Sequence, residues 1–305
     1  MSALRLGGER WCLPSVVGRS PAYEEREAER ADTDACLRYP DRLPYRLDIS
    51  GPPPDALDLL VQWGALDVEP VPDGLAALLP DSVTPDAVAR ALDGARVTVS
   101  AAVARDSGSV WLLRPRAVRI GSVLITSPEE DAPPTALRLI DAPAFGTGHH
   151  PTTALCIETL EEILTSARVG SVLDVGTGSG ILALAALKLG VPQAVGLDLD
   201  AASLRVAAEN ARLNDLAGRW QLVLGGPEAV EGNWPLVMAN VLAAPLMDMA
   251  SLLVRRVGSR GQLILSGIPS SLTSEVRQTY QHLGMRLIGA KTRAGWTALI
   301  AQASW

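Results

Sequence analysis

The segment best suited to chemistry is a glycine-rich turn at residues 176–180. The apolar run Val172–Val175 precedes it, Gly176, Gly178 and Gly180 lie within it, and an apolar helical pattern follows it. Glycine permits positive φ and lets a backbone pass close to a ligand, and the free N–H groups of a helix start bind anionic or polar groups. The sequence therefore predicts a ligand site here, although a purely structural strand-turn-helix shares the pattern.

The spacing of the glycines distinguishes between cofactors. A dinucleotide turn has the pattern G-x-G-x-x-G, with the pyrophosphate on the helix start, whereas this turn is G-x-G-x-G. Asp174 also lies where a negative charge would repel a pyrophosphate. Both points favour a cofactor without phosphates and with a cationic or zwitterionic end. S-adenosylmethionine, with its sulfonium, amino and carboxylate groups, fits this description.

A second polar position follows the next apolar strand. Asp198 ends the run Val195–Asp198, 22 positions after Gly176. An acidic residue there is placed to accept hydrogen bonds from both ribose hydroxyls of an adenosine. Asp200 directly precedes a helical pattern, and we expect it to cap that helix.

Asn240 is the candidate catalytic residue. It follows the apolar strand Leu236–Ala239, so it lies at the same edge of a parallel sheet. Its side-chain carbonyl can accept a hydrogen bond from an amine nucleophile and orient the lone pair. The alternative is a turn asparagine that satisfies local backbone groups. Spacing alone leaves both interpretations open.

A loop upstream, Ala144–Thr153, combines glycines, histidines and threonines. Such a loop before a helix is typical of ligand binding, and we expect Thr152 or Thr153 to cap the helix. Two adjacent histidines rarely share a metal ion, and a third ligand is not near, so no metal site is predicted. His149 or His150 could act as a general base, but the simpler interpretation is that they pack within the loop.

The elements that position these residues alternate between strands and helices, which predicts a doubly wound parallel sheet. A connection of five residues, 291–295, is too short for a parallel crossover, so the last two strands should form an antiparallel hairpin. The expected strands are Ser171–Val175, Ala194–Leu199, Trp220–Leu224, Leu236–Ala239, Gln262–Ser266, Met285–Ala290 and Trp296–Ala301; the expected helices are Thr153–Ser166, Gly180–Leu189, Ala201–Asn214, Ala243–Arg256 and Ser270–His282.

The preceding region has a different pattern. Short elements in the order β-α-β-(α)-β suggest a small α+β, ferredoxin-like domain. The alternative is an irregular accessory domain of another topology. We expect strands at Tyr45–Ile49, Ala65–Val71 and Arg96–Ala102, with helices at Ala56–Trp63 and Asp86–Leu92. The proline-rich, acidic stretch 128–134 is the best candidate linker. Predicted domains are therefore 1–42, an irregular extension; 43–130, a small domain with its connector; and 131–305, the doubly wound domain.

Composition narrows the class of protein. The 305 residues carry 27 basic and 34 acidic side chains, a net charge of −7, which argues against a nucleic-acid-binding protein. Three widely spaced cysteines, Cys12, Cys36 and Cys156, form no zinc pattern and suit a reducing cytosol. No signal peptide or membrane span is evident. We expect a cytoplasmic protein without a membrane partner.

Taken together, these segments resemble the PrmA family, the methyltransferases of large-subunit ribosomal protein L11. The matching stretches follow one another in the family's order over the last 165 or so residues, and the N-terminal half is similar more weakly. They are 144–153 (AFGTGHHPTT), 172–190 (VLDVGTGSGILALAALKLG), 195–200 (VGLDLD), 239–246 (ANVLAAPL), 265–268 (LSGI) and 295–299 (GWTAL).

The resemblance implies a class I methyltransferase fold with a terminal antiparallel hairpin, preceded by a ferredoxin-like domain for substrate docking. It implies S-adenosylmethionine as methyl donor, and transfer to lysine and N-terminal amines of a ribosomal protein. Separately, the net charge of −7 suits a basic protein substrate through electrostatic steering. Cofactor contacts are expected at Thr153, Gly176, Asp198 and Asn240, and also at Gly178, Gly180, Phe145, Gly146 and Thr147.

Three alternative functions remain open at this stage. The first is methylation of another protein or of a small molecule on the same scaffold. The second is binding of S-adenosylmethionine without catalysis, and the least favoured is an NAD-dependent oxidoreductase. The sequence leaves the oligomeric state open.

Overall fold

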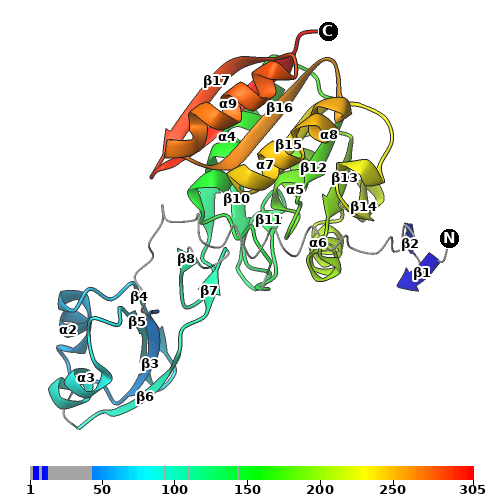
Figure 1. Cartoon of the computed structure of the whole chain (residues 1–305). Helices are drawn as coiled ribbons and strands as arrows, with labels where there is room; N and C mark the ends of the chain where they lie inside the picture. The colour runs from blue at the N-terminus through cyan, green and yellow to red at the C-terminus, as the bar shows by residue number, and fades with distance from the viewer. Residues whose placement is uncertain are drawn as a thin grey trace. The chain divides into compact units, whose positions relative to one another are not determined.

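The computed structural model describes residues 3–6, 9–12, 43–92, 94–106, 108, 110–142 and 144–305. The chain divides into two compact units between Arg114 and Pro115. One unit contains the described residues from 43 to 114, and the other contains residues 115–305 together with the first two short strands (Figure 1). We describe each unit by itself.

The larger unit is built on a seven-stranded sheet with the order β14-β13-β12-β15-β16-β18-β17. Neighbouring strands from β14 to β16 pair in parallel, whereas β18 is antiparallel to both β16 and β17. The strands are β12 (Ser171–Val175), β13 (Gln193–Asp198), β14 (Trp220–Leu224), β15 (Trp234–Asn240), β16 (Val257–Pro269), β17 (Met285–Arg293) and β18 (Trp296–Ala303).

Helices cover both faces of this sheet (Figure 1). Side chains of α4, α5 and α6 pack in one hydrophobic cluster, and those of α7, α8 and α9 pack in a second cluster on the other face. The helices are α4 (Pro151–Ser166), α5 (Ile181–Lys188), α6 (Ala201–Leu213), α7 (Ala243–Asp248), α8 (Ala250–Arg256) and α9 (Thr273–His282); three short 3₁₀ turns are η1 (Ala217–Arg219), η2 (Pro227–Ala229) and η3 (Ser270–Leu272).

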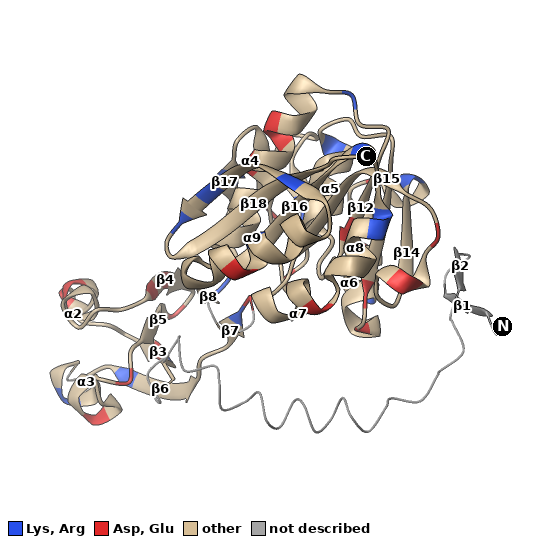
Figure 2. Ribbon diagram, turned by 45° about the horizontal axis from the view of Figure 1, so that its top comes forward, with Lys and Arg blue, Asp and Glu red and all other residues tan. Residues whose placement is uncertain are grey.

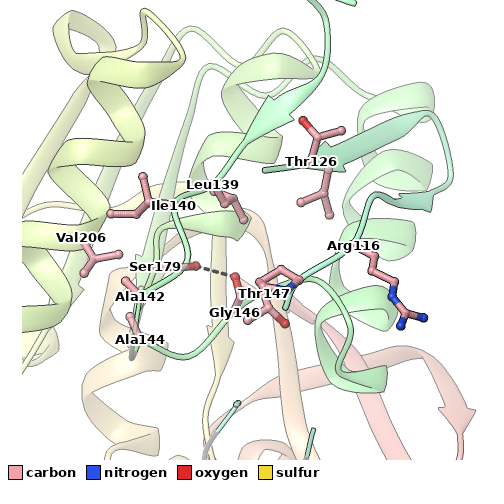
Figure 3. A pocket seen from close by; sticks show the side chains of 12 residues that line it. Arg116, Thr126, Leu139, Ile140, Ala142, Ala144, Gly146, Thr147, Ser179 and Val206 are labelled. Atoms are coloured by element: carbon pink, nitrogen blue, oxygen red, sulfur yellow. Dashed lines mark hydrogen bonds between the residues drawn. The ribbon is translucent and has the colours of Figure 1, made fainter. Parts of the chain in front are cut away.

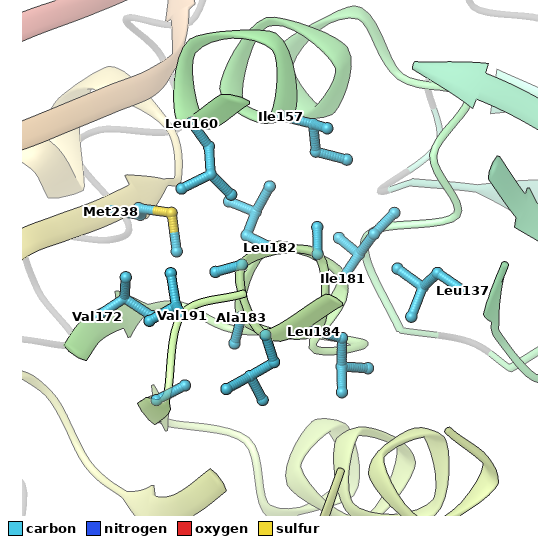
Figure 4. Close-up of a cluster of buried hydrophobic side chains, with 14 of the residues drawn as sticks. Leu137, Ile157, Leu160, Val172, Ile181, Leu182, Ala183, Leu184, Val191 and Met238 are labelled. Carbon is cyan, nitrogen blue, oxygen red and sulfur yellow. The ribbon is translucent and has the colours of Figure 1, made fainter. Parts of the chain in front are cut away.

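The first cluster supports the glycine-rich turn, because it surrounds α5, the helix that follows this turn. Leu160 of α4 and Met238 of β15 lie beside α5, whose residues Ile181 to Leu187 are all buried (Figure 4). A helix that is apolar on every side needs contacts on every side. These core contacts therefore fix the start of α5, where the glycine-rich turn ends.

The predicted parallel sheet and the antiparallel pairing of its last two strands are confirmed. Two details of the prediction are wrong. The expected helix Ala243–Arg256 is two helices, because the backbone at Met249 (φ −93°, ψ 8°) leaves the helical conformation. The expected helix from Ser270 begins with the 3₁₀ turn η3, and α9 follows from Thr273.

The edge strand β17 carries charges that limit pairing with other chains. Basic positions are coloured blue along β17 (Figure 2). Lys291 forms an ion pair with Glu162 at 2.8 Å, and Arg293 pairs with Glu158 at 2.9 Å, both glutamates lying on α4. Charged side chains on an edge strand hinder association with a foreign strand. These pairs also hold α4, the helix that follows the Ala144–Thr153 loop, against the sheet.

The smaller unit has the order β-α-β-β-α-β, with a four-stranded antiparallel sheet in the order β4-β5-β3-β6. The prediction missed β5, because its sequence GLAALL has no alternation of polar and apolar residues. The elements are β3 (Tyr45–Ser50), α2 (Ala56–Gln62), β4 (Asp67–Val71), β5 (Gly74–Leu79), α3 (Pro85–Ala91) and β6 (Arg96–Ala101), followed by the short pair β7 (Ala104–Arg105) and β8 (Val110–Trp111).

Further short strands complete the larger unit. A three-stranded sheet contains β9 (Val118–Ile120), β10 (Val123–Thr126) and β11 (Leu137–Arg138), so the predicted linker 128–134 connects two strands of one unit. The segment 115–130 packs with the larger unit, whereas the sequence predicts a domain boundary at 130/131. At the N-terminus, β1 (Ala3–Leu6) and β2 (Glu9–Cys12) pair antiparallel, while most of the expected extension 1–42, including its charged run 24–30, lies outside the described residues.

Candidate functional site

The glycine-rich turn leads from the carboxyl end of β12 into α5. Gly176, Gly178 and Gly180 all have positive φ, at +72°, +56° and +87°. The N–H groups of Gly176 and Thr177 both donate to the carbonyl oxygen of Leu197 in β13, at 2.9 and 2.8 Å. Positive φ at three alternate positions explains why glycine is needed at each.

The glycines also allow close approach of other parts of the protein. A Cβ at Gly176 would lie 2.5 Å from Val241 Cγ1, one at Gly178 would lie 2.6 Å from the Phe145 carbonyl oxygen, and one at Gly180 would lie 2.2 Å from the Trp220 ring. The turn is therefore packed between neighbouring segments. Contacts of Gly178 and Gly180 with a cofactor stay a prediction.

Asp174 lies in β12, two residues before Gly176, and is almost completely buried. Its Oδ2 accepts hydrogen bonds from the Thr177 hydroxyl at 2.6 Å and from the Ala183 N–H at 3.2 Å. Its Oδ1 has no partner within the described part of the chain. Burial raises the pKa of Asp174 to about 7, opposed by its two hydrogen bonds and assisted by the charge of Asp198.

This raised pKa predicts a pH-dependent stability difference between the wild type and Asp174→Asn. The unfolded carboxyl releases its proton near pH 4, so the unfolded state is progressively favoured from about pH 4 to the folded pKa of about 7. Relative to Asp174→Asn, the wild type should lose up to about 1.4 kcal/mol of unfolding free energy per pH unit in this window, and nothing more above it. Urea unfolding of both proteins from pH 4 to 8 measures the difference.

Asp200→Asn is the matched control for that experiment, because hydrogen bonds from Ala202 and Ser203 lower the pKa of Asp200. The stabilisation that the Asp200 carboxylate provides should be lost only as the pH falls below about 4. A difference between wild type and Asp174→Asn that stays constant from pH 4 to 8 would contradict the prediction.

Asp198 ends β13 beside the turn, at the position expected for ribose binding. Its Oδ2 accepts the Gly178 N–H at 2.8 Å, and its Oδ1 accepts the Asp200 N–H at 2.9 Å. A carboxylate offers about four lone-pair sites, so both oxygens retain acceptor capacity toward a ligand. The expected cap is confirmed, since the Asp200 side chain accepts from Ala202 and Ser203 at the start of α6.

Asn240 ends β15 and is 8% exposed. Its Nδ2 lies 3.5 Å from the Thr153 hydroxyl, while its Oδ1 has no hydrogen-bond partner among the described residues. Thr153 is fully buried in the first turn of α4. A buried carbonyl oxygen without a partner is costly, which favours the interpretation that Asn240 accepts from a ligand over that of a turn asparagine.

The loop Ala144–Thr153 contacts the glycine-rich turn and starts α4. The carbonyl oxygens of Phe145 and Gly146 accept the N–H and the hydroxyl of Ser179, at 2.9 and 2.7 Å. The expected capping by Thr152 or Thr153 is wrong: His150 is the N-cap, and its ring nitrogen accepts from the Thr152 N–H at 3.3 Å.

The two histidines of this loop are both engaged within it. The buried His150 ring makes T-shaped contacts with the rings of Phe145 and Trp296, with centroid distances of 5.6 and 5.0 Å. The His149 ring accepts the Arg116 N–H at 3.4 Å and lies 3.3 Å from the Thr147 hydroxyl. Both histidines therefore have structural contacts, within the loop and with Arg116 and Trp296 outside it.

The structure thus brings the predicted site segments into one connected group. The loop contacts the turn at Ser179, the turn contacts Asp198 at Gly178, and Asn240 contacts Thr153. Sequence reasoning missed Ser179, Val241 and Trp220, which fix the turn without a recognisable spacing of their own. Among the described residues, no cluster of three or more His, Cys, Asp or Glu side chains is arranged to hold a metal ion. Within the same residues, no helix has the length and hydrophobicity needed to cross a bilayer.

Comparisons with known proteins match this region. The family model "Ribosomal protein L11 methyltransferase (PrmA)" matches residues 86–304. A ribosomal protein L11 methyltransferase of Myxococcus xanthus is 33% identical over 272 residues, covering 80% of this chain and 92% of that protein. One of Pelobacter propionicus is 36% identical over 213 residues, covering 67% and 69%.

A solved structure agrees with these sequence matches. The crystal structure of a ribosomal protein L11 methylase from Lactobacillus delbrueckii subsp. bulgaricus aligns with a TM-score of 0.56 and 30% identity, and covers 62% of this chain and 100% of that chain. The residues of the candidate site, from Phe145 to Asn240, all lie within the range that the family model matches.

Proposed function

Since the chain belongs to the ribosomal protein L11 methyltransferase family, we propose that it transfers methyl groups from S-adenosylmethionine to amines of ribosomal protein L11. The larger unit has the class I methyltransferase fold of that family. The observation that carries the proposal is the buried Asn240 Oδ1, which has no partner among the described residues; Asn240 ends β15, the strand that pairs with β12 just before the glycine-rich turn.

The site residues fit S-adenosylmethionine. Asp198 retains acceptor capacity for ribose hydroxyls, and the turn 176–180 leads into a helix start that favours a carboxylate. Thr153, Gly176, Asp198 and Asn240 would hold the cofactor, with Phe145, Gly146, Thr147, Gly178 and Gly180 around them. When bound, the cofactor supplies an activated electrophilic methyl group on its sulfonium.

Asn240 would act on the acceptor amine. Its Nδ2 is directed to the Thr153 hydroxyl, which leaves Oδ1 to accept an N–H of a neutral amine and to orient its lone pair. Holding the amine and the methyl donor together in the reactive geometry can contribute roughly 7–11 kcal/mol in favourable cases, and Asn240 would supply part of this effect. A lysine amine has a pKa of about 10.4, and desolvation at this buried position favours loss of its proton.

The smaller unit supports a basic protein substrate. Residues 43–114 contain ten acidic and five basic side chains, so they hold −5 of the chain's net charge of −7. An acidic surface speeds encounter with a basic partner. We propose that this unit is a ferredoxin-like domain which, with its connector up to residue 130, docks the substrate. Residues 131–305 would then perform the transfer. The methyl acceptors would be lysine and N-terminal amines, and the reaction would take place in the cytoplasm.

The proposal is tested by incubating purified L11 with the enzyme and S-adenosylmethionine. Intact-mass spectrometry should show whole-methyl increments on L11, and peptide mapping should place them on lysines or on the N-terminal amine. The reaction without cofactor is the control. Labelling of another protein in a lysate but not of L11 would favour a different substrate, and cofactor binding without any methyl acceptor would favour a non-catalytic role.

A further inference from the structure

Ser179, between Gly178 and Gly180, has every polar group bonded to another segment. Its N–H donates to the Phe145 carbonyl oxygen at 2.9 Å, and its hydroxyl donates to the Gly146 carbonyl oxygen at 2.7 Å (Figure 3). Its own carbonyl oxygen accepts from Asn210 Nδ2 at 2.9 Å. Ser179 is 5% exposed and Asn210 is completely buried, so these bonds are shielded from water.

Asn210, on α6, extends this connection to a third segment. Its Oδ1 accepts the Ile140 N–H at 2.9 Å, a few residues before the 144–147 loop. Asn210 therefore joins the glycine-rich turn to the approach of that loop. Asn214, the C-cap of α6, accepts the Arg138 N–H at 2.9 Å and donates to the carbonyl oxygens of Arg138 and Asn210, at 2.7 and 2.8 Å, but has no bond to the turn.

The loop and the turn are also in van der Waals contact. A Cβ at Gly146 would lie 2.6 Å from Ser179 Oγ and 2.9 Å from Ile181 Cγ2, and one at Gly178 would lie 2.6 Å from the Phe145 carbonyl oxygen. Gly146 of the loop and Ser179 of the turn line the same pocket (Figure 3). The hydrogen bonds of Ser179 and Asn210 thus hold the loop and the turn together where both form the wall of this pocket.

We propose that Ser179 and Asn210 form a clasp that holds the 144–147 loop against the glycine-rich turn, and that this clasp determines the affinity for the cofactor. The inference rests on the proposed function, since it takes S-adenosylmethionine as the ligand of this site. Loop ordering costs conformational entropy, and apparent affinity falls with the fraction of molecules in the binding-competent arrangement. Both residues position the loop and need not touch the reacting atoms.

The test compares Ser179→Ala and Asn210→Asp with Asn214→Asp. Ser179→Ala removes only the hydroxyl bond to Gly146, and Asn210→Asp replaces the donor to Ser179 with an acceptor of the same shape. Asn214→Asp makes the same change one turn away. By calorimetry, the Kd for S-adenosylmethionine should rise about tenfold in the first two variants, as expected for loss of one buried bond. In Asn214→Asp the Kd should stay within about twofold of the wild-type value. This difference in Kd should appear even where the melting temperatures of the three variants fall equally.

Hydrogen exchange without cofactor gives a second readout. Amides of residues 144–147 should exchange faster in Ser179→Ala and Asn210→Asp than in the wild type or in Asn214→Asp. Unchanged exchange and Kd in Ser179→Ala would overturn the clasp, and so would affinity losses that follow the melting temperature alike in all three variants. A wild type that shows the protected loop but binds no S-adenosylmethionine would instead refute the proposed function.

Discussion

Asn240→Ala is expected to lower kcat by about 100-fold while the Kd for S-adenosylmethionine changes only a few-fold, because misplacing a reacting group by about 1 Å costs on this order. The variant removes the Oδ1 atom, which has no partner within the described chain, and within the protein it loses only the long Nδ2 bond to the Thr153 hydroxyl, at 3.5 Å. Initial rates at saturating cofactor and calorimetric titration separate the two effects.

Asn233→Ala is the matched control, because Asn233 directly precedes β15 whereas Asn240 ends the same strand. Asn233 is exposed, bonds to the Arg255 carbonyl oxygen and lies at the opposite edge of the sheet. Its replacement should leave kcat unchanged. Equal losses of turnover and cofactor affinity in Asn240→Ala would make Asn240 a cofactor contact only.

Gly178→Ala is expected to reduce both folding stability and cofactor binding. The substitution forces alanine into the left-handed backbone conformation that Gly178 has, with φ +56°. It also places a Cβ 2.6 Å from the Phe145 carbonyl oxygen. The strained backbone costs about 1 kcal/mol, and overpacking against backbone adds about 1–3 kcal/mol. We expect a loss of about 2–4 kcal/mol in urea unfolding and a Kd for S-adenosylmethionine raised by more than about tenfold.

Gly51→Ala separates strain from overpacking. Gly51 has a similar positive φ, +64°, but an added Cβ would meet no atom within 4 Å. This variant should lose only about 1 kcal/mol and should bind the cofactor normally. Identical losses in Gly178→Ala and Gly51→Ala would show that close contact between turn and loop is unimportant.

The sheet was predictable because its strands are short apolar runs separated by clear helical patterns. The expected strands Ser171–Val175 and Trp220–Leu224 coincide with β12 and β14. Parallel strands also place their carboxyl ends at one edge, and this predicts that Gly176, Asp198 and Asn240 lie near one another. The contacts of the turn with Asp198 and with Val241, next to Asn240, agree with that expectation.

Other features could not be read from the sequence. The residues of β5, Gly74–Leu79, form a continuous apolar run, which is compatible with a buried strand or with a helix. His150 caps α4 although threonines follow it, because the loop turns the ring toward the helix start. Asn210 carries no recognisable signal, since its role depends on where α6 packs against Ile140 and Ser179.

The position of β18 has a consequence for how the chain assembles during synthesis. β18 follows β17 along the chain but lies between β16 and β17, and β17 pairs with β18 alone. Until β18 has been made, β16 lacks the partner for one of its edges and β17 has no neighbour in the sheet. Joining the β17–β18 hairpin to β16 therefore completes this sheet, after β12, β13 and β15, which carry the site, have been synthesised.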